Sequence, residues 1–150
     1  MPIGELCNRE VVFATRKTTI VEAAQLMRRY HVGDLVVVDE IERRRVPVGI
    51  VTDRDIVVEV VAKVCPAEEC TVESIMGTQL VSVAENAGVI EAIRLMRAHG
   101  VRRIPVVGGD GDLVGIVSVD DMLDLLAEEL AELAKVAPRQ QIQEVRSRIG

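Results

Sequence analysis

The apolar positions of this chain follow a short run of periodic segments that occurs twice. Each run begins with an extended apolar stretch, continues with apolar residues at helical spacing, and ends with two stretches rich in β-branched residues. The first run predicts these elements: a strand at Val11–Ala14, a helix at Ile20–Tyr30, and strands at Leu35–Val38 and Val46–Val51. The second run predicts these: a strand at Leu80–Val83, a helix at Val89–His99, and strands at Ile104–Val107 and Leu113–Val117. A further helix is expected to begin near Asp53 in one run and near Val119 in the other.

The repetition extends to individual residues. At an offset of 69, Glu22 matches Glu91 and the triplet Leu26–Arg28 matches Leu95–Arg97. At an offset of 66, the sequence VGIV occurs at both Val48–Val51 and Val114–Val117. Since a unit of about 60 residues is marginal alone, we expect two units that share a core. The predicted fold is therefore α/β, with two β-α-β-β-α repeats at 1–62 and 74–127, a linker at 63–73 and a helical extension at 128–150.

Composition and charge restrict the possible functions. The 150 residues are 49% hydrophobic, which is enough for a core, but only 1% aromatic. Few aromatic rings and a net charge of −6 argue against a nucleic-acid partner, which needs stacking surfaces or phosphate neutralisation. No apolar run is long enough to span a membrane, and the first residues do not resemble a signal peptide. We expect a cytoplasmic protein with three free thiols, at Cys7, Cys65 and Cys70.

One motif follows the last strand of each half. The first copy, GIVT-x-x-D, ends in Thr52 and Asp55, and the second, GIVS-x-x-D, ends in Ser118 and Asp121. A hydroxyl residue followed three positions later by an acid predicts a helix capping box. The same turn between strand and helix is also a common ligand site, where an aspartate can accept hydrogen bonds from a ribose diol. The two interpretations are compatible.

These paired motifs, together with VRRIPVV at Val101–Val107, resemble those of a tandem CBS domain pair, the Bateman module. The resemblance covers about Leu6 to Leu126. It implies two repeats packed with pseudo-two-fold symmetry, and two clefts between them that take adenosine ligands such as AMP, ADP, ATP, NAD or S-adenosylmethionine. Carried over by position, it implies a first cleft lined by Ile50, Thr52, Arg54, Asp55, Leu80, Val81, Arg102 and Arg103.

The resemblance also implies a second cleft, lined by Val11, Val12, Ile116, Ser118 and Asp121. Here the two halves differ, because Gly33-Asp34 stand where the second half has Arg102-Arg103. Asp120 likewise stands where the first half has Arg54. Since Asp34 and Asp120 add negative charge near an anionic ligand, we expect the Asp55 cleft to bind more tightly than the Asp121 cleft.

Other candidate residues have simpler interpretations. Cys65 and Cys70 lack the further ligands that a metal site needs, and His31 and His99 are expected at helix ends. Arg43–Arg45 are expected in a solvated hairpin tip, and Gly108–Gly111 in a turn. No nucleophile stands beside a base in any motif, so no enzymatic activity is predicted.

The end of the chain bears on partners. Leu123, Leu126, Leu130 and Leu133 lie at helical spacing, and Pro138 is expected to end their helix. This helix is expected either to pack on its own domain or to form a homodimer interface. The predicted function is an adenine-nucleotide sensor that regulates a partner protein. The alternative is an interaction module that acts through dimerisation and has no physiological nucleotide.

Overall fold

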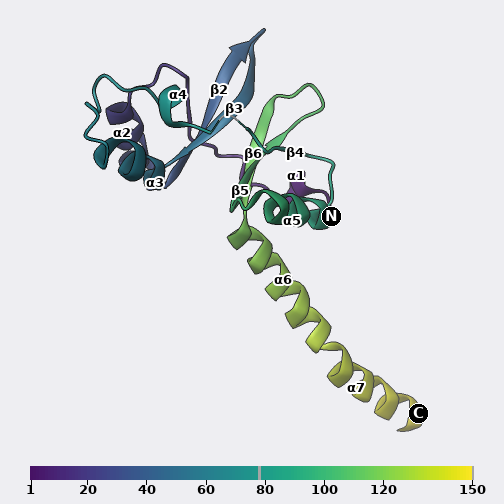
Figure 1. Ribbon diagram of the computed structural model, residues 1–150. Helices are drawn as coiled ribbons and strands as arrows, with labels where there is room; N and C mark the ends of the chain where they lie inside the picture. The colour runs from purple at the N-terminus through teal and green to yellow at the C-terminus, as the bar shows by residue number, and fades with distance from the viewer. Residues whose placement is uncertain (78, 150) are drawn as a thin grey trace.

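The structure is a computed structural model that describes residues 1–77 and 79–149. It contains two three-stranded sheets, each flanked by helices, and a long helical arm (Figure 1). The first half contains α1 (Ile3–Leu6), β1 (Phe13–Ala14), α2 (Ile20–Tyr30), β2 (Asp34–Ile41), β3 (Arg44–Thr52), α3 (Asp53–Asp55) and the π-helix η1 (Ile56–Val61). The second half contains α4 (Val72–Ile75), β4 (Val83–Ala84), α5 (Val89–His99), β5 (Arg103–Val107), β6 (Leu113–Ser118), α6 (Val119–Ala134) and α7 (Val136–Ile149).

The two sheets have the same topology. In each, the short first strand runs parallel to the second, and the second pairs antiparallel with the third. The predicted α/β fold class and the β-α-β-β-α order of each repeat are therefore confirmed. The early strands are shorter than predicted, because only Phe13 and Ala14 pair with β2, and only Val83 and Ala84 pair with β5.

The β2–β3 hairpin is longer than predicted. Residues 40–45 were expected to form a charged loop, yet only Glu42 and Arg43 form the turn. Both have positive φ angles, 50° and 68°. A two-residue turn of this kind matches the twist of the flanking strands, so the ladder continues to the tip.

The tip of this hairpin was predicted to be solvated. Instead, part of it contacts the β5–β6 hairpin of the other half. Arg44 donates from a guanidinium nitrogen to the carbonyl oxygen of Asp110 at 2.9 Å. The backbone N–H of Arg45 donates to Oδ1 of Asp112 at 2.8 Å. The Arg45 guanidinium also lies 4.2 Å from the centre of the Phe13 ring, a cation–π distance. The two hydrogen bonds tie the halves together at one end, and the cation–π contact fixes Arg45 within the first half.

Each half is completed by a short helix that precedes the other half in sequence. Ile3 of α1 is fully buried in the second core, and its N–H donates to the carbonyl oxygen of Ala87 at 2.7 Å. Val72 of α4 is fully buried in the first core, and its N–H donates to the carbonyl oxygen of Thr18 at 2.9 Å. The two halves therefore exchange their leading segments symmetrically.

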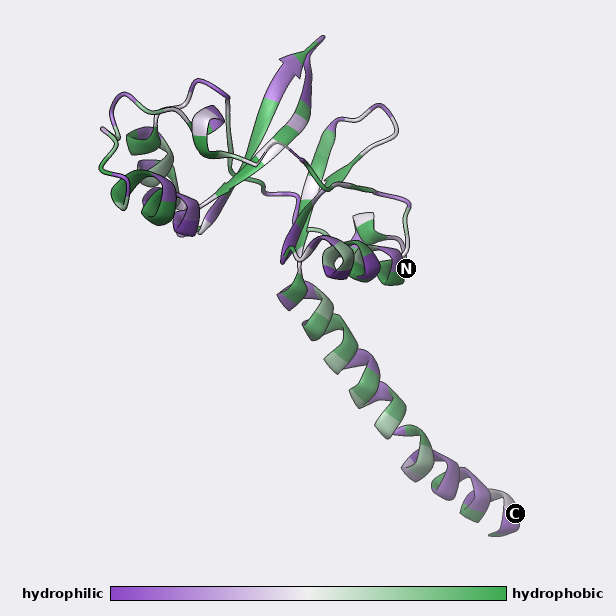
Figure 2. Ribbon diagram, viewed as in Figure 1, coloured by the Kyte–Doolittle hydropathy of each residue, from purple (hydrophilic) through white to green (hydrophobic). Residues whose placement is uncertain are grey.

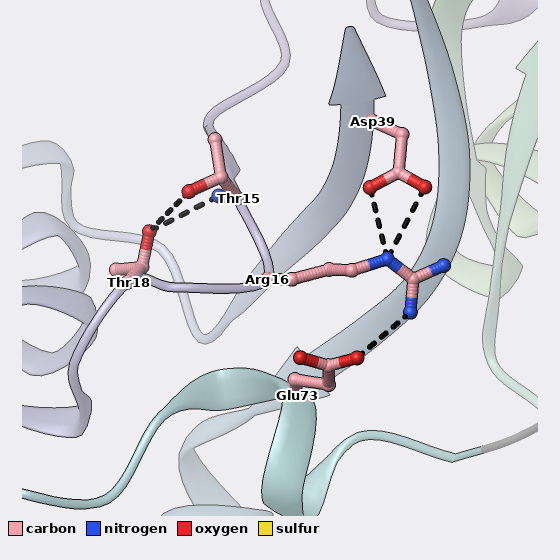
Figure 3. Close-up of polar contacts among 5 residues, drawn as sticks. All are labelled: Thr15, Arg16, Thr18, Asp39 and Glu73. Carbon is pink, nitrogen blue, oxygen red and sulfur yellow. Dashed lines mark hydrogen bonds and ion pairs between the residues drawn. The ribbon is translucent and has the colours of Figure 1, made fainter.

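Polar contacts hold α4 on the first half (Figure 3). Arg16 donates from Nε to Asp39, which lies in β2, at 2.9 Å. The same guanidinium reaches Glu73 of α4 at 3.3 Å. Because one guanidinium bridges two carboxylates from different segments, it fixes the path of the chain between the halves.

The sheets contact each other through β3 and β6, but each half has its own hydrophobic core, so the expected single shared core is not found. In β2, Leu35 and Val37 belong to the first core, whereas Val36 and Val38 are fully buried but point to the opposite face. In β5, Pro105 lies between core residues and is also buried. Burial on both faces explains why the middle strands are continuous apolar runs in the sequence, without alternation (Figure 2).

The C-terminal helices project away from both cores (Figure 1). Every side chain from Leu126 to Ile149 is exposed, so of the two alternatives expected for this segment, packing on its own domain is not found. Helix α6 ends at Ala134 rather than at Pro138, which lies in the first turn of α7. The proline ring would clash with the carbonyl four residues earlier, that of Ala134, which explains why the first helix ends there. Within the described residues no helix is both long and apolar enough to cross a bilayer.

Candidate functional site

The turn after β3 is a complete capping box. The hydroxyl oxygen of Thr52 accepts from the N–H of Asp55 at 3.1 Å, and Oδ2 of Asp55 accepts from the N–H of Thr52 at 2.9 Å. Among the residues that the structure describes, no hydrogen bond reaches the other carboxylate oxygen, Oδ1 of Asp55. The capping interpretation is therefore correct, and it still leaves one acceptor for a ligand.

The turn after β6 repeats this arrangement with one difference. Oδ2 of Asp121 accepts from the N–H of Ser118 at 2.7 Å, and the hydroxyl of Ser118 accepts from the N–H of Asp121 at 3.2 Å. The Ser118 hydroxyl also lies 2.9 Å from Oδ2 of Asp121 and donates to it. Its proton is thus already used, whereas the corresponding proton of Thr52 is available to a phosphate oxygen.

A cavity of about 610 Å³, here called the Asp55 cleft, lies in front of the first turn. Its volume is within the usual range for small-molecule sites. All eight residues predicted for the first cleft line it: Ile50, Thr52, Arg54, Asp55, Leu80, Val81, Arg102 and Arg103. Sequence reasoning did not assign the remaining lining residues to this cleft: Gly33, Asp34, Asp53, Gly77, Gln79, Gly100 and Val101.

A second cavity of about 260 Å³, here called the Asp121 cleft, lies in front of the other turn. All five residues predicted for it line the cavity: Val11, Val12, Ile116, Ser118 and Asp121. Asp34 also lines this cavity, as expected, whereas Asp120, expected beside it, is not among the lining residues. Six others were not assigned to this cleft: Asn8, Glu10, His31, Val32, Gly33 and Arg103. His31 lies at the end of α2, as predicted. It also lines this cleft, and the sequence does not show this because it depends on how α2 packs beside β2.

A glycine in each GIV motif allows a neighbouring segment to come close. A Cβ on Gly115 would lie 2.6 Å from Sγ of Cys7 and 2.7 Å from the carbonyl oxygen of Asn8. Asn8 is held there by two backbone hydrogen bonds of 2.9 Å with Ile116. A Cβ on Gly49 would instead lie 2.8 Å from Sδ of Met76, a flexible side chain. The segment that borders the Asp121 cleft is therefore fixed more tightly at its glycine.

Asp34 and Arg103 occupy equivalent positions of the two repeats, and they meet between the two clefts. Oδ1 of Asp34 lies 3.1 Å from Nε of Arg103, and the Asp34 side chain is only 12% exposed. Both residues line both cavities. A ligand phosphate in either cleft would therefore compete with Asp34 for the same guanidinium.

The pKa of Asp34 is raised above its ordinary value. Burial is the main cause, because it disfavours the carboxylate, and the negative charge of Asp53 adds to the effect. Arg103 opposes both by stabilising the charged form. Asp34 thus gains a proton more easily than an exposed aspartate, and protonation would release Arg103.

The two clefts differ in their balance of charge. The Asp55 cleft has three arginines, Arg54, Arg102 and Arg103, whereas Arg103 is the arginine of the Asp121 cleft. Arg102 lies 3.8 Å from Asp120, but both side chains are 73% exposed, so this pair is weak and easily exchanged for a ligand contact. The Asp55 cleft therefore offers more positive charge to an anion.

The polar and apolar groups of the two clefts suit the parts of a small-molecule ligand. Within residues 1–77 and 79–149, no group of three or more His, Cys, Asp or Glu side chains could hold a metal ion. Cys7, Cys65 and Cys70 are free thiols, and burial raises the pKa of Cys7. What both clefts provide is a carboxylate oxygen not used in the capping box, apolar side chains and at least one guanidinium, which match a ribose, a base and a phosphate.

Comparison with known proteins gives consistent matches. The family model described as "CBS domain" matches residues 3–62 and 72–128. An uncharacterized protein of Methanopyrus kandleri is 37% identical over 123 residues, which are 82% of this chain and 61% of that protein. The chain thus spans less than two thirds of that relative.

Two solved structures are similar in both sequence and fold. The CBS domain protein PAE2072 from Pyrobaculum aerophilum, complexed with AMP, is 29% identical with a TM-score of 0.72, over 81% of this chain and 89% of that one. The CBS domain pair of protein MJ0100, in complex with 5′-methylthioadenosine and S-adenosyl-L-methionine, is 25% identical with a TM-score of 0.74. That match covers 86% of this chain and 98% of the other.

Proposed function

The chain belongs to the CBS domain family, as a tandem pair of repeats, and from this premise we propose that it is a regulatory module that binds an adenosine nucleotide. The observation that carries the proposal is the Asp55 cleft itself. It combines a capping-box aspartate with one unused carboxylate oxygen, a cavity of about 610 Å³ and three arginines. The two similar structures with AMP or S-adenosyl-L-methionine bound support the same ligand class.

Each part of the ligand has a counterpart in the Asp55 cleft. Oδ1 of Asp55 accepts hydrogen bonds from the two ribose hydroxyls. An ionised carboxylate suits this role because it accepts hydrogen bonds and both hydroxyls can donate. Ile50, Leu80 and Val81 provide the apolar walls for adenine. The phosphate is held by the Thr52 hydroxyl, together with the arginines Arg54, Arg102 and Arg103. AMP, ADP, ATP, NAD and S-adenosylmethionine all carry the adenosine part that this cleft recognises.

The Asp121 cleft is proposed as a weaker second site. Val11, Val12 and Ile116 line its apolar side, and Asp121 offers the ribose acceptor. Its volume of about 260 Å³ is smaller, and the Ser118 hydroxyl already donates to Asp121. It therefore takes a nucleotide with lower affinity, or a ligand with less negative charge.

The proposed mechanism is a shift between arrangements of the two repeats. A nucleotide in either cleft contacts both halves, so it favours the arrangement in which those contacts form, by an amount set by its differential affinity. A regulated partner protein would then respond to that arrangement, with the chain acting as a homodimer. We propose no catalytic role, and the family match indicates no catalytic family.

Thermal denaturation tests the proposal. A ligand present at 100 times its dissociation constant stabilises the folded state by about 2.7 kcal/mol. We expect the melting temperature to rise with at least one of AMP, ADP, ATP, NAD or S-adenosylmethionine. A D55A/D121A double variant, which lacks both ribose acceptors, is the matched control and should show no rise. If none of these ligands changes the melting temperature of the wild-type chain, the alternative is favoured, a protein–protein interaction module with empty clefts.

A further inference from the structure

The arm formed by α6 and α7 has an apolar stripe that runs beyond both cores. Six of its apolar side chains are between 46% and 81% exposed: Leu126, Leu130, Leu133, Ile142, Val145 and Ile149. Their spacing of three and four residues places them on one face of each helix. A stripe of this length exposed to water is typical of a surface that another helix covers.

The two helices of the arm carry opposite charge. Residues 119–134 include six acidic side chains and no lysine or arginine. Residues 135–149 include four basic side chains and a single acidic one, Glu144. The arm therefore has an acidic half next to the domain and a basic half at its end. A second arm laid antiparallel would place each acidic half against a basic one, whereas a parallel arm would place like charges together.

The apolar spacing fits the same orientation. Along α6 the exposed leucines follow steps of four and then three, from Leu126 to Leu130 to Leu133. Along α7 the same order of steps, four and then three, is found when the helix is followed from its C-terminal end, from Ile149 to Val145 to Ile142. An antiparallel partner presents α7 in this direction. Pairing the three leucines with these residues places α7 of one copy along the second half of α6 of the other, from Leu126 to Ala134.

From the charges and the spacing we infer that the arm is the dimer interface of this chain: two copies associate antiparallel, with α6 of each against α7 of the other. The two-fold axis then passes between Ala137 and Pro138, in the first turn of α7, and the interface uses the same surface on both copies. Leu130 faces Val145 of the partner subunit, and Glu129 faces Arg146 of the partner subunit. The inference gives a surface and an orientation to the proposed homodimer, and it does not depend on nucleotide binding.

The acidic half argues against a membrane as the occupant. A helix that lies on anionic lipid carries basic residues on its polar face, and six carboxylates over residues 119–134 would be repelled. A second copy satisfies both halves of the arm at once. Each domain pair then lies at one end of the coil, away from the other.

Sedimentation equilibrium of the full chain tests whether the arm is the interface. We expect a dimer for the wild-type chain and a monomer for L130E/L133E, since both leucines are 67% exposed and their replacement leaves the domain cores intact. Circular dichroism of the variant checks that it is folded. A monomeric wild-type chain, including one that binds anionic phosphatidylserine vesicles as a monomer, would overturn the inference. A folded L130E/L133E variant that remains a dimer would overturn it as well.

Charge reversal tests the orientation. E129K should raise the dimer dissociation constant about tenfold, because two ion pairs per dimer become repulsive, and E129K/R146E should restore it. E128K is the matched control, since Glu128 lies two residues from both Leu126 and Leu130 and therefore on the outer face. A dimer equally stable in wild type and E129K would show that the arms are not antiparallel. Nucleotide binding to L130E/L133E, measured by calorimetry, separates a failure of this interface from a failure of the proposed ligand site.

Discussion

The Asp55 cleft and the Asp121 cleft descend from the same repeated motif, and yet they offer a ligand different environments. Both have a capping box, an aspartate with an unused oxygen and apolar walls. The first has about 610 Å³ and three arginines, and the second about 260 Å³ and one arginine. The difference in charge arises at two positions: Arg54 of the first motif corresponds to Asp120 of the second, and Arg102 corresponds to Gly33. In a duplicated fold, the shared residues of a motif can thus form the same turn twice, while its variable residues and those across the cleft give each copy a different charge.

The largest difference is expected when each aspartate is removed. D55A should weaken AMP binding by at least about 100-fold, because two hydrogen bonds to a charged acceptor contribute about 3 kcal/mol or more. D121A removes the corresponding residue of the other capping box, so it controls for the loss of helix capping, and it should leave the tight site nearly unchanged. Isothermal titration calorimetry measures both. An equal loss of affinity in the two variants would contradict the ranking of the clefts.

The two motif glycines should differ in stability. In G115A the new methyl group meets the backbone of Asn8, which is fixed by its hydrogen bonds to Ile116, and we expect a loss of about 1–3 kcal/mol. In G49A the methyl group meets the Met76 side chain, which can move, so the loss should be smaller. Urea denaturation of both variants gives the comparison. A G49A variant less stable than G115A would show that the two segments are not held as described.

The two hydroxyl residues should have equal roles in capping and unequal roles in binding. T52A and S118A each lose a helix cap, at a cost of about 1 kcal/mol in the free energy of unfolding. Only T52A should also weaken AMP binding, by several-fold, since the Ser118 proton is already donated to Asp121. Calorimetry and urea denaturation on the same samples separate the two effects. A loss of affinity in S118A as large as in T52A would disprove this distinction.

The smallest expected effect comes from the ion pair shared by both clefts. Because the pKa of Asp34 is raised, the folded protein binds a proton at Asp34 more tightly than the unfolded chain does. The free energy of unfolding therefore decreases as the pH rises through that pKa and Asp34 ionises. As the pH falls towards the raised pKa of Asp34, the carboxylate begins to lose its charge and Arg103 becomes available. Binding of NAD, whose phosphodiester groups keep their charge over this range, should tighten by a few-fold.

The D34N variant is the control for this pH effect. It lacks the titrating group, so its affinity for NAD should exceed that of the wild type at pH 7 and change less with pH. Calorimetry at three pH values is sufficient. A D34N variant with the same pH dependence as the wild type would assign the effect to another group.

Much of this fold followed from the sequence because the duplication is visible in it. The strands and helices of each half, the turns at Thr52 and Ser118 and the thirteen predicted cleft residues came from pattern and resemblance. The exchange of α1 and α4 did not, since four-residue helices leave no periodic signal. The Asp34–Arg103 pair was also missed, because residues 69 positions apart meet only when the repeats face each other. The sequence also left open whether the C-terminal helix packs on its own domain or on a second copy. An amphipathic pattern predicts an apolar face but does not show which surface covers that face.

The proposed ranking of the two clefts requires that the Asp55 cleft takes an adenosine nucleotide in preference to the Asp121 cleft. A crystal structure of the full chain with AMP at a concentration that saturates only the tighter site tests this most directly. We expect AMP in the Asp55 cleft, with both ribose hydroxyls within hydrogen-bond distance of Asp55 and the phosphate beside Arg102 or Arg103. AMP found in the Asp121 cleft alone, or in neither cleft, would contradict it.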